Sequence, residues 1–201
     1  MRIENLSPGG FAANCYLLCD GRAAILIDPT ADLAALRQAL LEKDVSPAAI
    51  LLTHGHFDHI LTADALREGL DVPLYVHAED APLLHDAHKN ASALFMAPLL
   101  AKPADRLLQG GEVLQIGGFS IGVLHTPGHT QGSVVYTVGD LAFTGDTLFA
   151  DGYGRTDLYG GSTPLLRQSL KKLSTLPRTT RIFPGHGSSV LLCDALDHLL
   201  L

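Results

Sequence analysis

Cysteine is scarce in this chain, and long hydrophobic runs are missing. Its three cysteines, Cys15, Cys19 and Cys193, cannot all pair with one another and form no CxxC pattern, which argues against a disulfide framework. We expect reduced thiols buried in strands or a helix. No apolar stretch approaches the roughly 20 residues that a bilayer-spanning helix needs, and the N-terminus lacks a basic segment followed by an apolar one. These absences predict a cytoplasmic protein without a membrane span.

Positive charge is also in short supply. There are 14 lysines and arginines against 21 acidic residues, which gives a formal net charge of −7. Nucleic-acid-binding proteins concentrate lysine and arginine, so no nucleic-acid partner is expected. A hydrophobic content of 47% with 17% charged residues argues against disorder. We therefore expect one compact domain over residues 1–201, for which a homo-oligomer is possible.

The first third of the chain contains clear strand and helix signals. Residues 14–28 are predicted to be two apolar strands joined at the turn pair Asp20-Gly21. Leucines from Leu33 to Leu41 have helical spacing, and Ser46-Pro47 should end that helix. Residues 49–53 then form a short buried strand.

The remaining elements alternate between helices and strands. The predictions are the end of a helix over 64–69, a strand over 73–76, a helix over 79–88, glycine-separated strands over 105–149, a helix with Thr163 as its capping residue and Pro164 at its first position, and a strand over 181–183. The stretch 91–103 has no clear pattern. For the leucine-rich tail 190–201, packing against the core and a subunit contact are both open. The order of elements predicts an α/β (α+β) chain, with two packed sheets covered by helices.

The segment THGHFDHI, residues 53–60, is unusually rich in metal-binding side chains. His54, His56, Asp58 and His59 lie where a strand ends and a helix should begin, so a sharp turn can direct all four towards one volume. Imidazole and carboxylate suit zinc, iron, manganese or cobalt. The absence of nearby thiolates argues against a closed structural zinc site. The spacing is therefore typical of a catalytic metal site.

Three later segments add further candidate ligands. TPGHT contains His129, FTGD contains Asp146 and FPGH contains His186; each follows an apolar strand and has a glycine beside it. Glycine allows the backbone to approach a metal without an intervening side chain. One metal needs only three or four protein ligands, so this surplus indicates two divalent ions that share a bridging carboxylate.

The motifs NCYL, ILIDP, THGHFDH, TPGHTQGS, FTGDTLF, GRTDL and PGHG occur in an order that resembles the metallo-β-lactamase superfamily, within it the glyoxalase II-like (hydroxyacylglutathione hydrolase) branch. The resemblance implies a four-layer αββα sandwich of two mixed β-sheets flanked by helices, with two metals at one edge. It assigns the ligands as follows: His54, His56 and His129 to the first metal, Asp58, His59 and His186 to the second, and Asp146 as the bridge. Zinc is the expected metal; iron or manganese is possible.

The activity that this resemblance implies is hydrolysis of a thioester such as S-D-lactoylglutathione by a metal-bridging hydroxide. A thiolate leaves without protonation, so no separate general acid is required. Asp58 and Asp146 would act catalytically as ligands, and Asp58 could also move a proton with its second oxygen. In the loop GYGRTDL, Tyr153 or Arg155 could contact an anionic substrate; alternatively, Arg155 and Asp157 simply pair and fix the loop.

Two other enzymatic functions remain open, and a non-enzymatic one is disfavoured. A persulfide dioxygenase with one iron would use His54, His129 and Asp146, and a lactonase or other acyl hydrolase would use the same dimetal centre. Full-length glyoxalase II has a helical C-terminal region that helps to hold glutathione, whereas this chain ends 15 residues after His186. A module that only binds a partner predicts missing ligands, yet all seven are present.

The other histidines have weaker claims on the site. His77 and His125 are more often structural residues at such positions, with a smaller chance of lining the site. We expect His85, His88 and His198 to be solvated.

Overall fold

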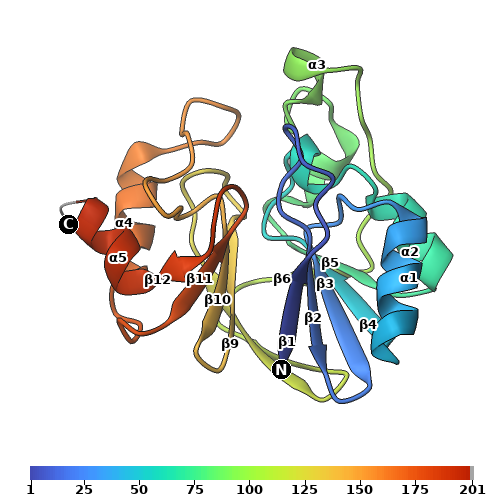
Figure 1. Ribbon diagram of the computed structural model, residues 1–201. Coiled ribbons are helices and arrows are strands. Elements are labelled where there is room, and N and C mark those ends of the chain that lie inside the picture. The colour runs from blue at the N-terminus through green and yellow to red at the C-terminus, as the bar shows by residue number, and fades with distance from the viewer. Residues whose placement is uncertain (200–201) are drawn as a thin grey trace.

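The computed structural model describes residues 1–199 and contains two six-stranded mixed sheets packed against each other (Figure 1). The first sheet has the order β1 (Arg2–Asn5), β2 (Tyr16–Asp20), β3 (Ala23–Ile27), β4 (Ser46–Leu51), β5 (Leu74–His77) and β6 (Arg106–Leu108). Its first three strands are antiparallel neighbours, and the pairs from β3 to β6 are parallel. The predicted hairpin over 14–28 is thus confirmed, although Asp20 pairs with Ala23 and the turn falls on Gly21 and Arg22.

The second sheet has the order β12 (Val190–Leu191), β11 (Arg181–Pro184), β10 (Leu141–Gly145), β9 (Val134–Val138), β8 (Phe119–His125) and β7 (Val113–Ile116). Strands β7 to β10 form an antiparallel meander, as the glycine-separated pattern predicts. Strand β11 returns parallel to β10 after a helical crossover. Both sheets are therefore mixed.

Helices cover the outer faces of the two sheets (Figure 1). Helices α1 (Leu33–Lys43) and α2 (Ala63–Leu70) cover the first sheet, and α4 (Thr163–Leu173) and α5 (Leu192–His198) cover the second. Three short elements lie in loops: η1 (Phe57–His59), η2 (Ala81–His85) and α3 (Ser92–Phe95). Helix α4 begins at Thr163, one residue earlier than predicted, because the capping side chain is that of Ser162, whose Oγ accepts the N–H of Leu165.

Three hydrophobic clusters fill the spaces between the layers. In β3, Leu26 points towards α1 and α2, whereas Ile25 and Ile27 point towards the second sheet. A strand buried on both faces must be apolar at every position, which explains the unbroken run AAILI. The third cluster fills the space between the second sheet and α4 with α5. The molecule is thus the expected four-layer αββα sandwich.

Two predicted boundaries are wrong. Residues 79–88 contain only the short 3₁₀ turn η2, because the Asp80 side chain and Pro82 direct this segment into a loop against the site. Strand β4 begins at Ser46 rather than residue 49. Its pairing with β3 shifts between Ala24 and Ile25, and this irregularity accommodates Pro47, which has no N–H to donate to the ladder.

The remaining expectations concern the tail and the cysteines. Leu192 and Leu196 of α5 are buried against the second sheet, which supports core packing for 190–199; Leu200 and Leu201 lie outside the described residues. Cys15 and Cys19 are buried, Cys193 is half-buried, and all three are free thiols. No helix among residues 1–199 has the length and apolar character to cross a membrane.

Candidate metal centre

The seven predicted ligands follow strands of both sheets and meet at one edge of the sandwich. His54 and His56 follow β4, and Asp58 and His59 lie in η1 directly after them. From the second sheet, His129 follows β8, Asp146 follows β10 and His186 follows β11. The site therefore straddles the boundary between the sheets, and its geometry depends on how they pack.

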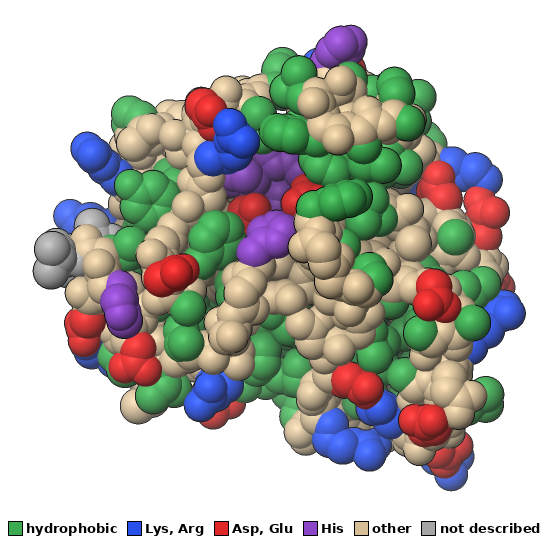
Figure 2. All heavy atoms as spheres, turned by 45° about the horizontal axis from the view of Figure 1, so that its top comes forward, with side chains coloured by type: hydrophobic (Ala, Val, Ile, Leu, Met, Phe, Trp, Pro, Cys, Tyr) green, Lys and Arg blue, Asp and Glu red, His purple; other side chains and the backbone are tan. Residues whose placement is uncertain are grey.

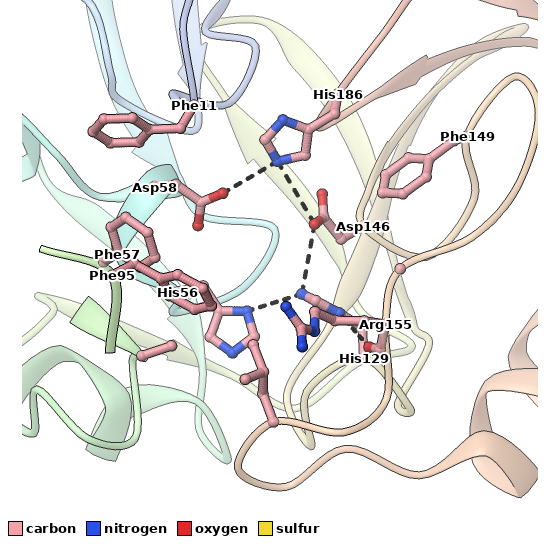
Figure 3. Close-up of a pocket in the computed structure, with 13 residues that line it drawn as sticks. Phe11, His56, Phe57, Asp58, Phe95, His129, Asp146, Phe149, Arg155 and His186 are labelled. Carbon is pink, nitrogen blue, oxygen red and sulfur yellow. Dashed lines mark hydrogen bonds and ion pairs between the residues drawn. The ribbon is translucent and has the colours of Figure 1, made fainter. Parts of the chain in front are cut away.

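Three imidazole nitrogens form the first group. The His129 Nε2 atom lies 2.8 Å from His56 Nδ1 and 3.2 Å from His54 Nε2 (Figure 3 shows the first of these contacts). All three rings are buried. Tetrahedral coordination with bonds of about 2.0–2.1 Å places ligand nitrogens about 3.3 Å apart. The cluster is thus close to the size that one metal ion requires, and the atoms belong to a single metal-compatible group.

The second group consists of Asp58, His59 and His186, whose ligand atoms also lie close together. The His186 Nε2 atom is 3.2 Å from Asp58 Oδ2. Asp146 lies between the two groups, and its Oδ1 is 3.2 Å from His59 Nε2. Its Oδ2 is 3.6 Å from His129 Nε2 and 3.7 Å from His186 Nε2, as Figure 3 shows. Asp146 therefore occupies the position that a bridging carboxylate requires.

Burial and neighbouring charges shift the pKa values of these side chains towards the protonation states that bind a metal. Burial, reinforced by the neighbouring histidines, lowers the pKa of His54 well below its ordinary value, and burial lowers the pKa of His56 to about 3. Both rings are therefore neutral and offer a lone pair. Although burial opposes it, the histidines around Asp146 lower the pKa of that carboxyl, and the hydrogen bond with His186 similarly lowers the pKa of Asp58. Both carboxyls are ionised.

The protonation of His59 indicates that the site favours a cation. Burial disfavours its charged form, yet the carboxylates of Asp28 and Asp146 raise its pKa well above the ordinary value. The proton on His59 thus supplies positive charge beside the carboxylates of Asp28 and Asp146, and a divalent ion would supply more. The buried atoms His59 Nε2 and Asp146 Oδ1 have no hydrogen-bond partner among the described residues. These observations fit a metal centre.

Hydrogen bonds from behind fix which nitrogen of each ring faces the site. The Nδ1–H of His59 donates to Asp28 Oδ2 at 2.8 Å, and the Nδ1–H of His129 donates to the Arg155 carbonyl at 2.8 Å. Both contacts leave Nε2 pointing at the candidate metal. Such partners orient metal-binding histidines and increase their basicity.

Two buried aspartates that support the site were not identified from the sequence. Asp28, at the end of β3, has a left-handed backbone (φ 53°) and accepts hydrogen bonds from the N–H and Oγ1 of Thr53, directly before the first ligand. Asp80 accepts from Gly55 N, Gly132 N and Thr130 Oγ1, and so joins the two histidine loops. Asp28 belongs to the ILIDP motif, but the motif itself assigns it no role, and no local signal distinguishes Asp80.

Glycines give the backbone room at the ligands. A Cβ atom on Gly185 would lie 2.2 Å from Asp146 Oδ1 and 2.6 Å from His59 Cε1. A Cβ atom on Gly154 would lie 2.2 Å from the Asp146 carbonyl and 2.8 Å from His129 Nδ1. Gly185 and Gly154 thus allow the backbone to pack closely against the candidate ligands.

A pocket of about 340 Å³ opens over the ligands. Figure 2 shows histidine and acidic side chains at the bottom of this hollow, with hydrophobic side chains around its rim. The residues that line it comprise five candidate ligands, the apolar side chains Phe11, Phe57, Ala91, Phe95, Phe149 and Leu158, and Gly154 with Arg155. A substrate that reaches the metals must pass between these aromatic walls.

Of the two predicted substrate-contact residues, only Arg155 lies at the pocket. Arg155 lines the pocket, and its guanidinium donates two hydrogen bonds to Asp157, at 2.6 and 2.8 Å. The pairing considered from the sequence is therefore present. Tyr153 is 47% exposed and does not line the pocket.

The remaining histidines lie outside the ligand groups. His77 is buried and stacks on His125, with ring centroids 4.1 Å apart. Neither ring lines the pocket or belongs to the groups of potential ligands. His85, His88 and His198 are exposed, as expected.

Comparison with known proteins shows relatives along nearly the whole chain. Residues 8–186 match the metallo-beta-lactamase superfamily. The probable metallo-hydrolase YqgX of Bacillus subtilis is 42% identical over 191 residues, which cover 93% of this chain and 90% of the relative. Hydroxyacylglutathione hydrolase GloC of Haemophilus influenzae is 36% identical over 194 residues, 94% of this chain and 92% of the relative.

Solved structures agree with the sequence relatives. The B3 metallo-beta-lactamase BLEG-1 superposes with a TM-score of 0.93 at 38% identity, covering 98% of this chain and 97% of that one. TTHA1623 in a di-iron-bound form gives 0.85 at 38% identity, with 95% and 96% covered. ETHE1 from Myxococcus xanthus gives 0.80 at 30% identity, with 98% and 83% covered. With its two mixed sheets, flanking helices and His/Asp cluster, the chain belongs to the metallo-beta-lactamase superfamily and is a metallo-hydrolase.

Proposed function

We propose that this protein is a dinuclear metallohydrolase that cleaves thioesters, with a hydroxyacylglutathione such as S-D-lactoylglutathione as the first candidate substrate, and that it acts in the cytoplasm. The observation that carries the proposal is the composition of the pocket. Among the described lining residues, the only polar side chain that is not a candidate ligand is Arg155. The pocket thus offers no separate general acid, and a thiolate is the leaving group that needs none.

The ligand arrangement supports two ions rather than one. Two groups of ligand atoms lie side by side, and a third, formed by His54, His59 and Asp146, joins them. TTHA1623, which is 38% identical, has been solved with two irons bound. Two divalent ions in such a site supply a water-derived nucleophile at neutral pH and polarise the carbonyl that it attacks. Zinc, iron and manganese all suit this donor set.

The chain's own residues would position the reactants. Asp58 presents one oxygen to the second group and lines the pocket, so its second oxygen can hold or move a proton next to the substrate. His59 and His129 are fixed by Asp28 and by the Arg155 carbonyl. Arg155 itself would contact an anionic group of the substrate, because Asp157 occupies only its Nε and one terminal nitrogen. Tyr153 would contribute only if its loop moved.

One relative favours the thioesterase directly, and others favour competing reactions. GloC, at 36% identity, is a hydroxyacylglutathione hydrolase. BLEG-1 is a B3 metallo-beta-lactamase, which makes β-lactam hydrolysis a second candidate. Hydrolysis of a β-lactam releases an amine, which must be protonated as it leaves. This pocket has no separate general acid for that step, so it suits a thiolate leaving group better. A lactonase, and a persulfide dioxygenase with one iron on His54, His129 and Asp146, are the remaining alternatives.

The experiment is a comparison of substrates with protein loaded with zinc, iron or manganese and analysed for metal content. We expect S-D-lactoylglutathione to be hydrolysed with a kcat/KM of roughly 10⁴ M⁻¹s⁻¹ or more, and two ions per chain. The variant His186→Ala should lose one ion and most of the activity. The variant His198→Ala, which changes an exposed histidine on α5, should retain both.

Each rival has its own outcome. Hydrolysis of nitrocefin but not of the thioester would favour the β-lactamase, and cleavage of homoserine lactones alone would favour the lactonase. Oxygen consumption with glutathione persulfide at one iron per chain would favour the dioxygenase. Any of these results, without thioester turnover, would refute the proposal.

A further inference from the structure

The aromatic wall of the pocket gives information about the substrate beyond the reaction type. Phe57 stacks on Phe95 with ring centroids 5.8 Å apart and planes 22° apart, and Phe11 lies 6.0 Å from Phe57. These three rings come from the β1–β2 loop, η1 and α3, and they stand along one side of the ligands (Figure 3). On the other side, Phe149 meets His186 edge-on with centroids 6.1 Å apart. The pocket is therefore a slot between aromatic surfaces.

Two rings of this wall are open to solvent. Phe11 is 62% exposed and Phe95 is 56% exposed, whereas Phe57 behind them is buried. Water contact with rings of this size is unfavourable, and both rings line a pocket that leads to the candidate metals. Their position favours an apolar ligand surface that would cover them in the complex.

The polar side of the pocket is correspondingly weak. Arg155 is the only lysine or arginine among the described lining residues, and Asp157 offsets its charge through two hydrogen bonds. Its guanidinium also lies 5.9 Å from the centre of the Phe95 ring. Glutathione has two carboxylates and an ammonium group, which need several polar partners that this lining does not provide.

We propose that the preferred substrates are thioesters whose thiol part is apolar and about the size of an aromatic ring, held between Phe11 and Phe95 on one side and Phe149 on the other. This inference rests on the thioesterase proposed above and changes its preferred leaving group from glutathione, the first candidate, to an apolar thiol. In the reaction, water adds its oxygen to the carbonyl carbon and the carbon–sulfur bond breaks. The products are the carboxylate, the thiolate and two protons. The slot would bind the thiol part before and during this step.

The first test compares thioacetates that differ only in the thiol. S-benzyl thioacetate, S-(2-hydroxyethyl) thioacetate and S-acetylglutathione share the acyl group, and the released thiol is measured with a chromogenic disulfide. We expect kcat/KM for the benzyl compound to exceed that for the hydroxyethyl compound by about tenfold or more, because one ring is buried. It should also exceed that for S-acetylglutathione. A glutathione ester that is preferred over the benzyl compound would overturn the inference.

The second test uses neighbouring residues of α3. Phe95→Ala should reduce the benzyl-to-hydroxyethyl ratio several-fold, as should Phe11→Ala independently; the ratio is insensitive to a general loss of activity. Leu94→Ala is the matched control, because Leu94 is 64% exposed on the same helix but does not line the pocket. An equal ratio in the wild type, Leu94→Ala and Phe95→Ala proteins would contradict the inference.

A binding measurement separates this inference from the proposed function. Saturation-transfer-difference NMR with benzyl alcohol and the zinc-loaded protein should show saturation of the ring protons in the wild type and Leu94→Ala, and much less in Phe95→Ala. If no thioester is hydrolysed but this pattern appears, the thioesterase proposal fails and the aromatic slot stands. If thioesters are hydrolysed and the ring protons show no Phe95-dependent saturation, only the slot is refuted.

Discussion

At the scale of single residues, Gly185 shows how a missing side chain supports the metal centre. A Cβ at this position would come within 2.2 Å of Asp146 Oδ1, the carboxylate between the two ligand groups. We predict that Gly185→Ala, purified with excess zinc, binds well under half of the wild-type metal. The change displaces Asp146 and the neighbouring His59 ring. Elemental analysis after gel filtration measures the metal content.

Gly187 provides the matched control for this substitution. It has a left-handed backbone (φ +80°) but no atom within 4 Å of an added Cβ. Gly187→Ala should therefore lower the free energy of unfolding by about 1 kcal/mol through backbone strain and leave metal binding unchanged. Equal metal content in both variants would show that the close contact at Gly185 is not important.

The titration of the buried histidines predicts how the stability of the chelated protein depends on pH. The ordinary histidine pKa is about 6.5. The pKa values of His54 and His56 are lowered in the folded protein. Below about pH 6.5 these two histidines are therefore protonated in the unfolded chain but not in the folded protein, and the free energy of unfolding falls as the pH falls. The pKa of His59 is raised in the folded protein. Its stabilising contribution to the free energy of unfolding is therefore complete below about pH 6.5 and is lost as the pH rises through this raised pKa. The metal-free protein should thus be most stable near pH 6.5.

Urea unfolding followed by circular dichroism from pH 5 to pH 8 tests this prediction. His59→Asn should flatten the alkaline side of the stability profile, and His56→Asn should reduce the slope of the acidic side. A free energy of unfolding that rises steadily to pH 8 in the wild type would contradict the assignment of the His59 proton.

At the scale of elements, Asp80 in the turn between β5 and η2 joins two ligand loops. Its Oδ1 accepts Gly132 N at 2.7 Å, and its Oδ2 accepts Gly55 N at 2.8 Å. An amide would turn its NH₂ group towards one of these donors. We predict that Asp80→Asn lowers the free energy of unfolding by about 2–3 kcal/mol and weakens metal binding, as measured by urea unfolding and metal titration.

The control for Asp80→Asn is Asp71→Asn. Asp71 is exposed at the end of α2 with a left-handed backbone (φ 53°), a conformation that asparagine also tolerates. The substitution should change stability by less than about 0.5 kcal/mol. If Asp80→Asn is equally mild, the three hydrogen bonds to Asp80 do not hold the loops together.

The elements also show which structural features are readable from the sequence. The β7–β10 meander and the strands that precede the ligands have short-range signals, namely apolar runs bounded by glycines. The loop over 79–88 was predicted as a helix because its leucines suggest one, whereas its structure depends on Asp80 contacting Gly132, a residue 52 positions away. Local patterns contain no information on such distant partners. The support that Asp28 gives His59 was missed for the same reason.

At the scale of the whole molecule, the candidate metals would connect the two sheets. The loop after β4 supplies four candidate ligands and the second sheet supplies three. One ion held at about 1,000 times its dissociation constant stabilises a folded protein by about 4 kcal/mol, so two such ions contribute about 8 kcal/mol. For a chain of this size, that corresponds to a change of about 16–32 °C in Tm. We predict that chelation lowers the Tm by this amount while unfolding remains one transition, as a single domain requires.

Circular dichroism is the suitable measurement, because the chain contains no tryptophan. Chelation should have little effect on the Tm of Gly185→Ala, which provides the control. Two separate transitions in the chelated protein would show that the halves fold independently and would contradict a single domain. The four-layer arrangement itself came from the resemblance of seven motifs, since the order of elements alone indicated only two sheets covered by helices.

The aromatic residues of the pocket and its candidate ligands lie on different segments of the chain. Most candidate ligands follow strands whose positions are set by the buried sheets, whereas Phe11, Phe95 and Phe149 lie on separate loops and a short helix at the rim. Mutations in those segments can alter the slot without disturbing the ligands. Phe57 is the exception, since it lies between His56 and Asp58. Substitutions at the rim can therefore change which substrates fit with little effect on metal binding.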